Sequence, residues 1–110
     1  MSDTKFTPGP WFANRRYIGV LGHKSFIGEC KDVNGNWSDT KTTAANANLI
    51  AAAPELYEAL EEAVKDLVAY QVNARIASTY NSKWEGVSEL VQPTIDSARA
   101  ALAKARGEKS

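Results

Sequence analysis

The stretch Ala44–Leu60, with the sequence AANANLIAAAPELYEAL, decides the fold. Its alanine, leucine and glutamate residues have high helix propensity, and Thr42 or Thr43 can cap the helix at its start. Pro54 disfavours the α conformation at the residue before it but suits the first turn of a new helix. We therefore predict a kinked helix over residues 43–78, with a short part before the proline and a long part after it.

Apolar residues recur at intervals of three and four along the long part of this helix, which predicts one buried face. The residues of that face are Leu56, Leu60, Ala63, Val64, Leu67 and Ala74. A second stripe follows a polar break and predicts a C-terminal helix over residues 88–106, with Pro93 in its first turns and Gly107 as its cap. Because both helices are amphipathic, each should pack along one face.

The first third of the chain has the short aromatic and β-branched runs that are typical of strands. Residues 1–10 are predicted to be an irregular lead-in, because Pro8, Gly9 and Pro10 prevent regular structure. Asn34-Gly35 predicts a type I′ hairpin turn, which needs positive φ at both central residues. The expected antiparallel strands occupy residues 11–38 and are Trp11–Val20, Ser25–Val33 and a short third strand at Asn36–Ser38.

These elements predict an α+β fold, in which a small N-terminal antiparallel sheet is followed by the kinked long helix and the C-terminal helix. A chain of 110 residues, of which 44% are hydrophobic and 24% charged, is typical of a single domain, here residues 1–110. The two helices have more apolar surface than one chain readily covers. We therefore expect a homo-oligomer, either a dimer or a larger assembly.

Thirteen basic and thirteen acidic residues balance, so no net field attracts nucleic acid or an anionic membrane. We expect neither a membrane partner nor sequence-specific binding to nucleic acid. Cys30 is the only cysteine and cannot form an intrachain disulfide, and no stretch resembles a signal peptide or a membrane span. A reducing cytoplasm is the expected compartment.

The sequence has few residues suited to catalysis. His23 is the only histidine, and it lies in a Gly-His-Lys turn, where an exposed polar residue is the ordinary interpretation. A dyad of Cys30 and His23 would require the two to meet across neighbouring strands, and one cysteine with one histidine is too few for a zinc site. We expect no enzymatic activity, no metal and no cofactor; an enzyme that depends on His23 is the least favoured alternative.

A binding site is the stronger hypothesis, because basic and aromatic residues occur together in the strands and again after the long helix. Guanidinium groups match phosphate geometry and aromatic rings stack on bases, so a small anionic nucleotide is the natural ligand. The candidate ligand-binding residues are Arg15, Arg16, Trp11, Tyr17, His23, Lys24, Arg75 and Trp84. The competing interpretation is that half of the strand aromatics face the core and the basic residues only cover the other face.

Two stretches, Thr7–Trp11 (TPGPW) and Ala45–Leu60 (ANANLIAAAPELYEAL), resemble small, mostly uncharacterised bacteriophage and prophage proteins. Those proteins share a Pro-Gly-Pro-Trp start, a few short strands and an Ala-Asn-Ala-x-Leu-Ile-Ala-Ala-Ala-Pro helix start. The resemblance implies a phage origin, this fold and the cytoplasm of a bacterial host. The order of an N-terminal sheet before long helices is also similar to phage sponge proteins, which inhibit Thoeris defence by sequestering a cyclic ADP-ribose signal.

Two hypotheses for the function follow. The first is a noncatalytic counter-defence protein that binds and sequesters a nucleotide-derived immune signal, a cyclic nucleotide or a cyclic ADP-ribose-like molecule. The second is a protein-interaction module that inhibits or adapts a host protein through its helical surface, with Tyr57, Tyr70 and Trp84 as anchors. A homo-oligomer is compatible with both.

Overall fold

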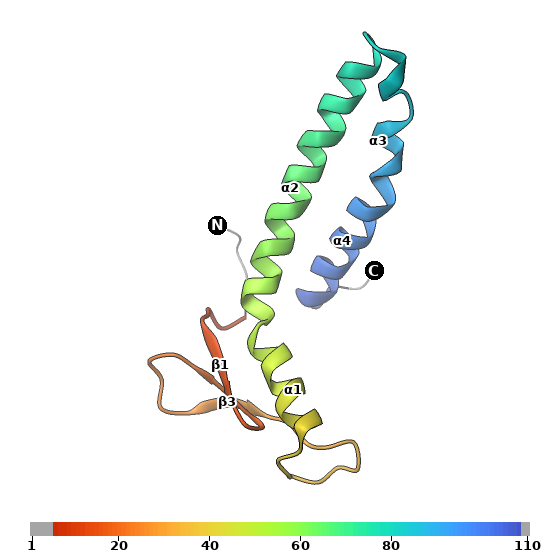
Figure 1. Ribbon diagram of the computed structural model, residues 1–110. Coiled ribbons are helices and arrows are strands. Elements are labelled where there is room, and N and C mark those ends of the chain that lie inside the picture. Colours follow the sequence, from red (N-terminus) through yellow and green to blue (C-terminus); the bar gives the residue numbers. More distant parts are fainter. Residues whose placement is uncertain (1–5, 109–110) are drawn as a thin grey trace. The chain divides into compact units, whose positions relative to one another are not determined.

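The computed structural model describes residues 6–108 and confirms the α+β fold class (Figure 1). Contacts along the backbone divide the chain into two compact units. The sheet unit, residues 6–56, contains the three strands and the first helix. The helical unit, residues 57–108 of the described part, contains most of the long helix and all that follows it. The single-domain prediction stays a prediction, and the first five residues of the predicted lead-in lie outside the described residues.

The sheet has three antiparallel strands in the order β1-β2-β3. They are β1 (Trp11–Asn14), β2 (Tyr17–Val20) and β3 (Phe26–Glu29). The prediction of one strand over Trp11–Val20 is wrong, because the chain reverses at Arg15, whose φ of 57° lies in the left-handed region. The pairing of Asn14 with Tyr17 closes this turn. The predicted sheet is therefore present, but its first two strands are the two halves of one predicted strand.

The third predicted strand, at Asn36–Ser38, is wrong, because the Asp32 carboxylate holds that segment in a loop. Its Oδ1 accepts hydrogen bonds from the backbone amides of Asn34 and Asn36, both at 2.9 Å, and its Oδ2 accepts one from the Ser38 hydroxyl at 2.7 Å. The chain does turn here, with Gly35 at a φ of 82°, but the predicted type I′ hairpin turn is wrong, because Asn34 does not have the positive φ that this turn type also requires. The side chain of Asp32 satisfies backbone donors that a strand partner would otherwise satisfy.

The first helix, α1 (Lys41–Ala51), begins at a different threonine from the two that were expected. Thr40 is its cap: the Oγ1 atom accepts a hydrogen bond of 3.0 Å from the amide of Thr43. Thr43 is instead fully buried, and its hydroxyl is hydrogen-bonded to that of Thr40. The break before the long helix is at Ala52, and α2 (Ala53–Ser78) has Pro54 in its first turn as predicted.

The core of the sheet unit is small. Ile18 of β2 packs with Ala47 and Ala51 of α1, and Trp11, Ala13 and Cys30 pack against this cluster. The alanine side chains allow the backbone of α1 to approach the sheet closely, so the alanine-rich stretch does provide helix packing. Such a core buries little apolar area, and the unit also depends on polar contacts.

The helical unit continues after α2 with η1 (Ser82–Trp84), α3 (Val87–Leu90) and α4 (Gln92–Ala105), and α4 runs back along α2 (Figure 1). The predicted helix over residues 88–106 is thus divided at Val91. Pro93 lies in the first turn of α4, as predicted. Gly107 caps it with a φ of 82°, and the amide of Glu108 donates to the carbonyl of Ala103 at 2.9 Å.

The buried face of α2 differs in part from the predicted stripe. Leu56 is 54% exposed and Ala63 is exposed, so both assignments are wrong. The buried residues of the helical unit are Tyr57, Val64, Gln71, Ala74, Ser88, Ile95 and Leu102. Tyr57, Val64 and Gln71 are seven residues apart, and this spacing keeps one line of side chains facing a neighbouring antiparallel helix. A polar residue within this line was not expected.

Gln71 is buried because it has hydrogen-bond partners at the junction of α3 and α4. Its Nε2 atom donates to the carbonyl of Ser88 at 3.0 Å and to Oε1 of Gln92 at 2.7 Å. At the other end of the unit, Nη1 of Arg106 donates to the hydroxyl of Tyr57 at 3.1 Å. Polar contacts therefore fix α2 and the C-terminal segment at both ends of their apolar contact.

Candidate binding surface

The strand register places three aromatic rings on the outer face of the sheet. Phe12, Gly19 and Phe26 form one cross-strand row, and Tyr17 lies two residues before the glycine on the same face. The rings of Tyr17 and Phe26 are stacked at 4.8 Å between centroids, and those of Phe12 and Phe26 meet edge to face at 6.5 Å. Phe12 is 38% exposed and Phe26 48%. We call Phe12, Tyr17 and Phe26 the aromatic face.

A bulge and a glycine make the aromatic face possible. Ile18 pairs with Gly28 but Gly19 pairs with Phe26, so Ile27 is an extra residue in β3. Without this bulge Phe26 would point to the opposite side of the sheet, because successive side chains alternate. A Cβ atom added to Gly19 would lie 2.6 Å from Cζ of Phe12, so the Phe12 ring occupies the place of a side chain there.

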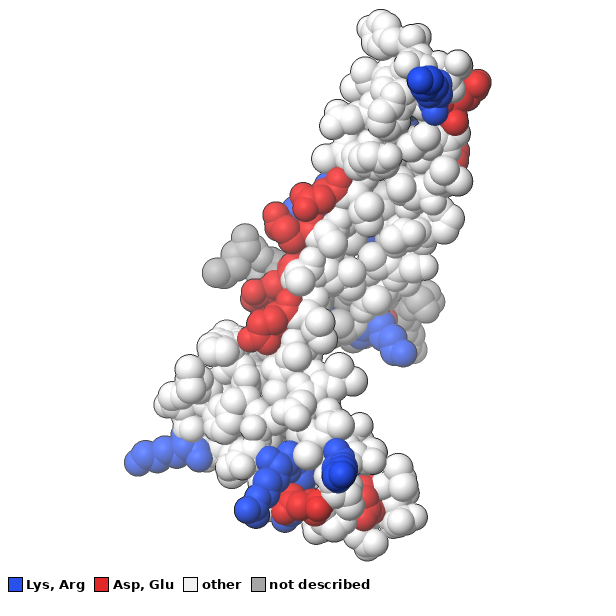
Figure 2. All heavy atoms as spheres, viewed as in Figure 1, with Lys and Arg blue, Asp and Glu red and all other residues white. Residues whose placement is uncertain are grey.

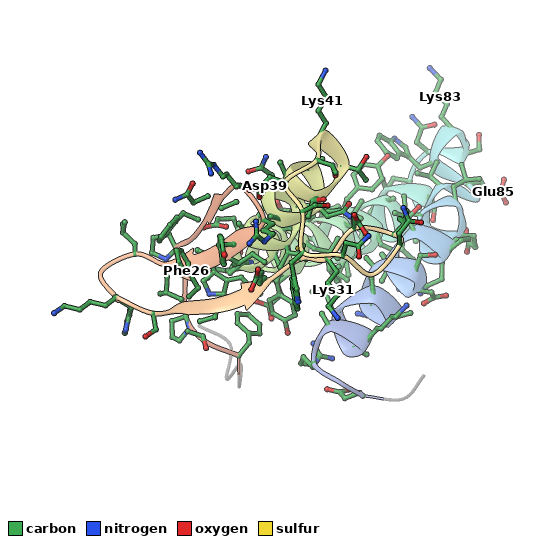
Figure 3. All side chains as sticks on the ribbon, turned by 90° about the horizontal axis from the view of Figure 1, so that it is seen from below. Phe26, Lys31, Asp39, Lys41, Lys83 and Glu85 are labelled. Carbon is green, nitrogen blue, oxygen red and sulfur yellow. The ribbon has the colours of Figure 1, made fainter. Side chains whose placement is uncertain are left out.

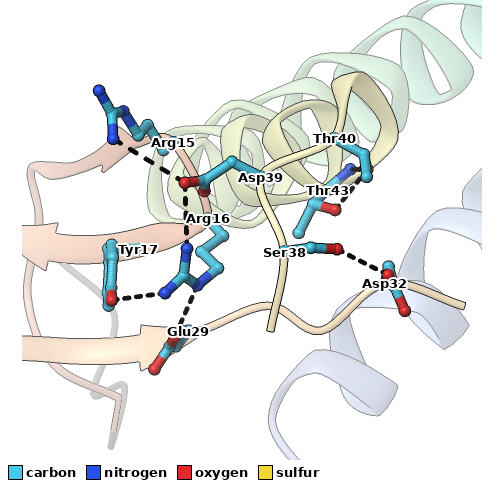
Figure 4. A network of polar contacts seen from close by, with 9 residues as sticks. All are labelled: Arg15, Arg16, Tyr17, Glu29, Asp32, Ser38, Asp39, Thr40 and Thr43. Atoms are coloured by element: carbon cyan, nitrogen blue, oxygen red, sulfur yellow. Dashed lines mark hydrogen bonds and ion pairs between the residues drawn. The ribbon is translucent and has the colours of Figure 1, made fainter. Parts of the chain in front are cut away.

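Arg16 connects the aromatic face to the rest of the sheet unit (Figure 4). Its Nε atom donates to Oε2 of Glu29 at 2.7 Å, Nη2 donates to the hydroxyl of Tyr17 at 2.8 Å, and Nη1 lies 3.0 Å from Oδ2 of Asp39. The guanidinium also lies over the Tyr17 ring, 4.7 Å from its centroid. The hydrogen bond to Glu29 is the main cause of the raised pKa of Arg16. Arg16 thus orients Tyr17 and joins β3 to the segment before α1.

The other basic residues of the sheet are at its two ends. Arg15 is in the turn between β1 and β2, largely exposed, with Nη1 3.9 Å from Oδ2 of Asp39. His23 and Lys24 are exposed in the turn between β2 and β3, at the opposite end of the hairpin. Trp11 belongs to neither group: it packs on the core, and its Nε1 atom donates to the carbonyl of Thr7 at 3.0 Å. The structure therefore brings Arg15, Arg16 and Tyr17 together but separates them from His23 and Lys24.

Another exposed aromatic residue, Trp37, lies after β3 in the loop that Asp32 holds. Trp37 is covered on one side by Lys31, whose Nζ atom lies 4.7 Å from the ring centroid. Lys31 projects from the chain beyond the sheet, whereas Phe26 lies on the sheet itself (Figure 3). The hydrogen bond from Ser38, followed by that from the amide of Asn36, lowers the pKa of Asp32. The loop is thus held by an ionised carboxylate.

Arg75 and Trp84 belong to the helical unit, so the predicted binding residues are distributed over both units. Trp84 meets Tyr70 edge to face at 6.5 Å between centroids, and both rings are partly exposed. Arg75 is exposed near the end of α2. Tyr57 is buried, so its expected role as an exposed anchor is wrong; it lies on the face of α2 that packs inward.

The residues considered for chemistry do not converge. His23 precedes β3 and Cys30 follows it, and about 13 Å of strand separates Phe26 from Cys30. Cys30 packs against the core of the sheet unit. Among residues 6–108 there is no group of three histidine, cysteine or acidic side chains that could hold a metal ion. Within the same residues no helix has the length and apolar character needed to cross a membrane.

Comparison with known protein families identifies a match along nearly the whole chain. The family model of Salmonella phage P22 protein Y8K6 matches residues 1–109. The chain belongs to this phage protein family. No curated protein and no solved structure matches it. The phage origin that the resemblance implied is confirmed, whereas the similarity to Thoeris inhibitors stays a prediction.

In this member of the Y8K6 family, the two stretches on which the resemblance rested are in contact. A Cβ atom added to Gly9 would lie 3.2 Å from Cβ of Pro54, and Pro54 is buried. The carbonyl of Pro10 accepts a hydrogen bond of 3.1 Å from the amide of Leu21, which holds the same stretch to the end of β2. The Pro-Gly-Pro-Trp segment is thus part of the packing of the sheet unit and lies apart from the exposed aromatic face.

Proposed function

We propose that this phage protein is a noncatalytic counter-defence protein that binds and sequesters a nucleotide-derived immune signal in the cytoplasm of the bacterial host. The signal would be a cyclic nucleotide or a cyclic ADP-ribose-like molecule. The observation that carries the proposal is the aromatic face, whose three rings are partly exposed and whose Tyr17 lies under the Arg16 guanidinium, with the exposed Arg15 in the turn before β2. It supports binding because rings exposed on the outside of a sheet contribute little to the core of this unit.

The chemistry of the face suits a planar anion. Aromatic rings stack on any base, and each such contact contributes about 1–3 kcal/mol. Arg16 is largely neutralised by Glu29 and Asp39, so its main role would be to hold Tyr17 in place. Arg15 is much more exposed, and its guanidinium can make bidentate hydrogen bonds to a phosphate. In this proposal Phe26 stacks on a base and Arg15 contacts the phosphate.

Calorimetry tests this proposal directly. The full chain is titrated with cyclic dinucleotides, cyclic trinucleotides and cyclic ADP-ribose isomers, with Phe26→Ala and Arg15→Ala as variants. At least one ligand should bind, and Phe26→Ala should weaken binding about tenfold or more. Tyr80→Ala is the matched control, because Tyr80 is an exposed aromatic residue of the other unit. Absence of heat with every ligand would reject the proposal.

A second candidate function is a protein-interaction module that inhibits or adapts a host protein. The observation that favours it is the exposed pair of Tyr70 and Trp84, since aromatic residues on a helical surface are common anchors of protein interfaces. A pull-down from host lysate with the wild-type chain and with Trp84→Ala distinguishes it from the first. A host protein retained by the wild type but lost with Trp84→Ala supports it, and equal retention by both contradicts it.

A further inference from the structure

The cross-strand row of Phe12, Gly19 and Phe26 has a gap at its centre. The three residues are partners on the outer face of the sheet, and the glycine lies between the two rings without a side chain of its own. A Cβ atom added to Gly19 would lie 2.6 Å from Cζ of Phe12 and 2.7 Å from its Cε1, so the tip of the Phe12 ring covers this position. We call the space above Gly19, between Phe12 and Phe26, the glycine gap.

The two walls of the glycine gap are held in different ways. Phe26 stacks on Tyr17 at 4.8 Å between centroids, and the Tyr17 hydroxyl accepts a hydrogen bond of 2.8 Å from Arg16. Phe12 meets Phe26 edge to face at 6.5 Å between centroids and is 38% exposed. Exposed side chains change rotamer within nanoseconds. Phe26 is therefore the supported wall of the gap, and Phe12 is the wall that can move.

The width of the glycine gap suits one planar base. Phe12 and Phe26 lie on β1 and β3, which flank β2, so their backbones are separated by two strand spacings, or about 9.5 Å. A base between two parallel rings requires ring planes about 7 Å apart, because carbon atoms in contact are about 3.5 Å from each other. Since side chains stand roughly perpendicular to a sheet, the two rings need to lean inward only slightly to contact both faces of a base.

We propose that one base of the ligand enters the glycine gap and is sandwiched between Phe12 and Phe26, with the Phe12 ring turning aside from Gly19 to admit it. This inference rests on the proposed function and adds to it the place of the base, its two stacking partners and its class. Two aromatic rings recognise the area of a base and not the hydrogen-bonding groups at its edge. The gap should therefore bind a purine more tightly than a pyrimidine, with little difference between adenine and guanine.

The charges of the sheet unit favour this placement of the ligand. On the side of the unit that Figure 2 shows, the charged side chains gather in its lower part, and the surface above them is uncharged. Arg15, the exposed cation of the proposed site, lies in the turn between β1 and β2, beyond the end of the strand that bears Phe12. In this arrangement the uncharged base lies over the middle of the sheet, and the phosphate lies towards the turn.

Two matched substitutions at Phe12 test the sandwich by calorimetry of the full chain. The titrants are cyclic dinucleotides of adenine, guanine and uracil, together with the cyclic ADP-ribose isomers. Phe12→Leu keeps an apolar cover over Gly19 but removes the ring, so it should weaken binding at least about fivefold. Phe12→Tyr keeps the ring and should bind within about twofold of the wild type. Circular dichroism of each variant checks that the sheet unit is folded.

The outcomes distinguish the sandwich from the proposed function itself. If Phe26→Ala weakens binding but Phe12→Leu does not, the base stacks on Phe26 alone, and the sandwich is overturned while the proposed function stands. Absence of heat with the wild type and every titrant would reject both. In nuclear magnetic resonance spectra of the complex, base protons should show Overhauser contacts to both rings, and contacts to Phe26 alone would contradict the sandwich. A preference of more than about tenfold between adenine and guanine would assign recognition to the base edge and overturn the proposed class of base.

Discussion

The sheet unit and the helical unit are of similar length but are stabilised in different ways. In the sheet unit four-residue strands and a short helix enclose a small core around Ile18, and the side chains of Arg16 and Asp32 fix the loops. In the helical unit α2 and α4 bury a line of apolar residues, and Gln71 is the polar exception. Short elements bury too little area to define their own positions, so hydrogen bonds and ion pairs of side chains take a larger part.

The largest loss of stability is expected when a buried apolar side chain of the helical unit is truncated. Ile95 is fully buried, and Ile95→Ala should lower the free energy of unfolding by about 3 kcal/mol. Leu90→Ala, at an exposed position, is the control and should cost far less. Urea denaturation gives the magnitude, and hydrogen exchange locates the loss. Equal loss of protection in residues 6–56 would show that the two units unfold as one and would remove the contrast between them.

The polar exception in the helical unit should have an intermediate effect. Gln71→Met keeps the length of the side chain but leaves the buried carbonyl of Ser88 and the Oε1 atom of Gln92 without this donor. We expect a loss of about 1–2 kcal/mol in urea denaturation. Gln92→Met removes one of the two hydrogen bonds of Gln71, together with the exposed one that Gln92 donates to Asp96, and leaves the buried carbonyl of Ser88 its donor, so it should cost less. Unchanged stability in Gln71→Met would mean that apolar contact alone determines this unit.

The N-terminal cap of α1, which lies in the sheet unit, should contribute less to the free energy of unfolding than Gln71 does. Thr40→Ala removes the acceptor for the amide of Thr43 and should lower the free energy of unfolding by about 1 kcal/mol. Thr40→Ser keeps the hydroxyl and should be close to the wild type. Thermal denaturation followed by circular dichroism compares the two. A loss as large with serine as with alanine would assign the effect to the threonine methyl group rather than to the cap.

The smallest predicted effect is a difference in salt dependence between Asp32 and Glu108, because the pKa values of these two carboxylates are lowered for different reasons. The pKa of Asp32 is lowered by hydrogen bonds from Ser38 and the backbone, and that of Glu108 mainly by its hydrogen bond with Arg106. For both, the stabilising contribution is complete above the unfolded-state pKa and is lost as pH falls through the lower folded-state pKa. Carboxyl titration by nuclear magnetic resonance should show that salt moves the pKa of Glu108 back towards its ordinary value but leaves Asp32 nearly unchanged. Equal salt dependence would contradict this assignment.

The helical unit was easier to predict from sequence than the sheet unit, for a physical reason. The period of α2, the proline in α4 and the glycine cap at Gly107 are local signals, and the structure has all three. Where α2 begins, the exposure of Leu56, the last residue of the sheet unit, was missed because propensity does not state which of two adjacent apolar residues faces a neighbour.

In the sheet unit the prediction errors arise from side chains whose partners are far from them in the sequence. Arg15 occupies a left-handed turn position where glycine or asparagine would be the usual signal, and Arg16 beside it bonds to Glu29 and Asp39. The aromatic face depends on the bulge at Ile27, which has no sequence signature. Of the candidate site, the structure brings Arg15, Arg16 and Tyr17 together, and their role in binding stays a prediction. Their separation from the residues of the second turn could not be predicted without the strand register.

The contact of Gly9 with Pro54 has a consequence for how this protein family can change. A side chain at position 9 would press against the proline ring, so a substitution there should be tolerated best when position 54 changes with it. The two positions are far apart in the chain, yet selection should act on them as a pair. Relatives that have lost the glycine should therefore also have lost the proline, and in them the long helix should begin differently.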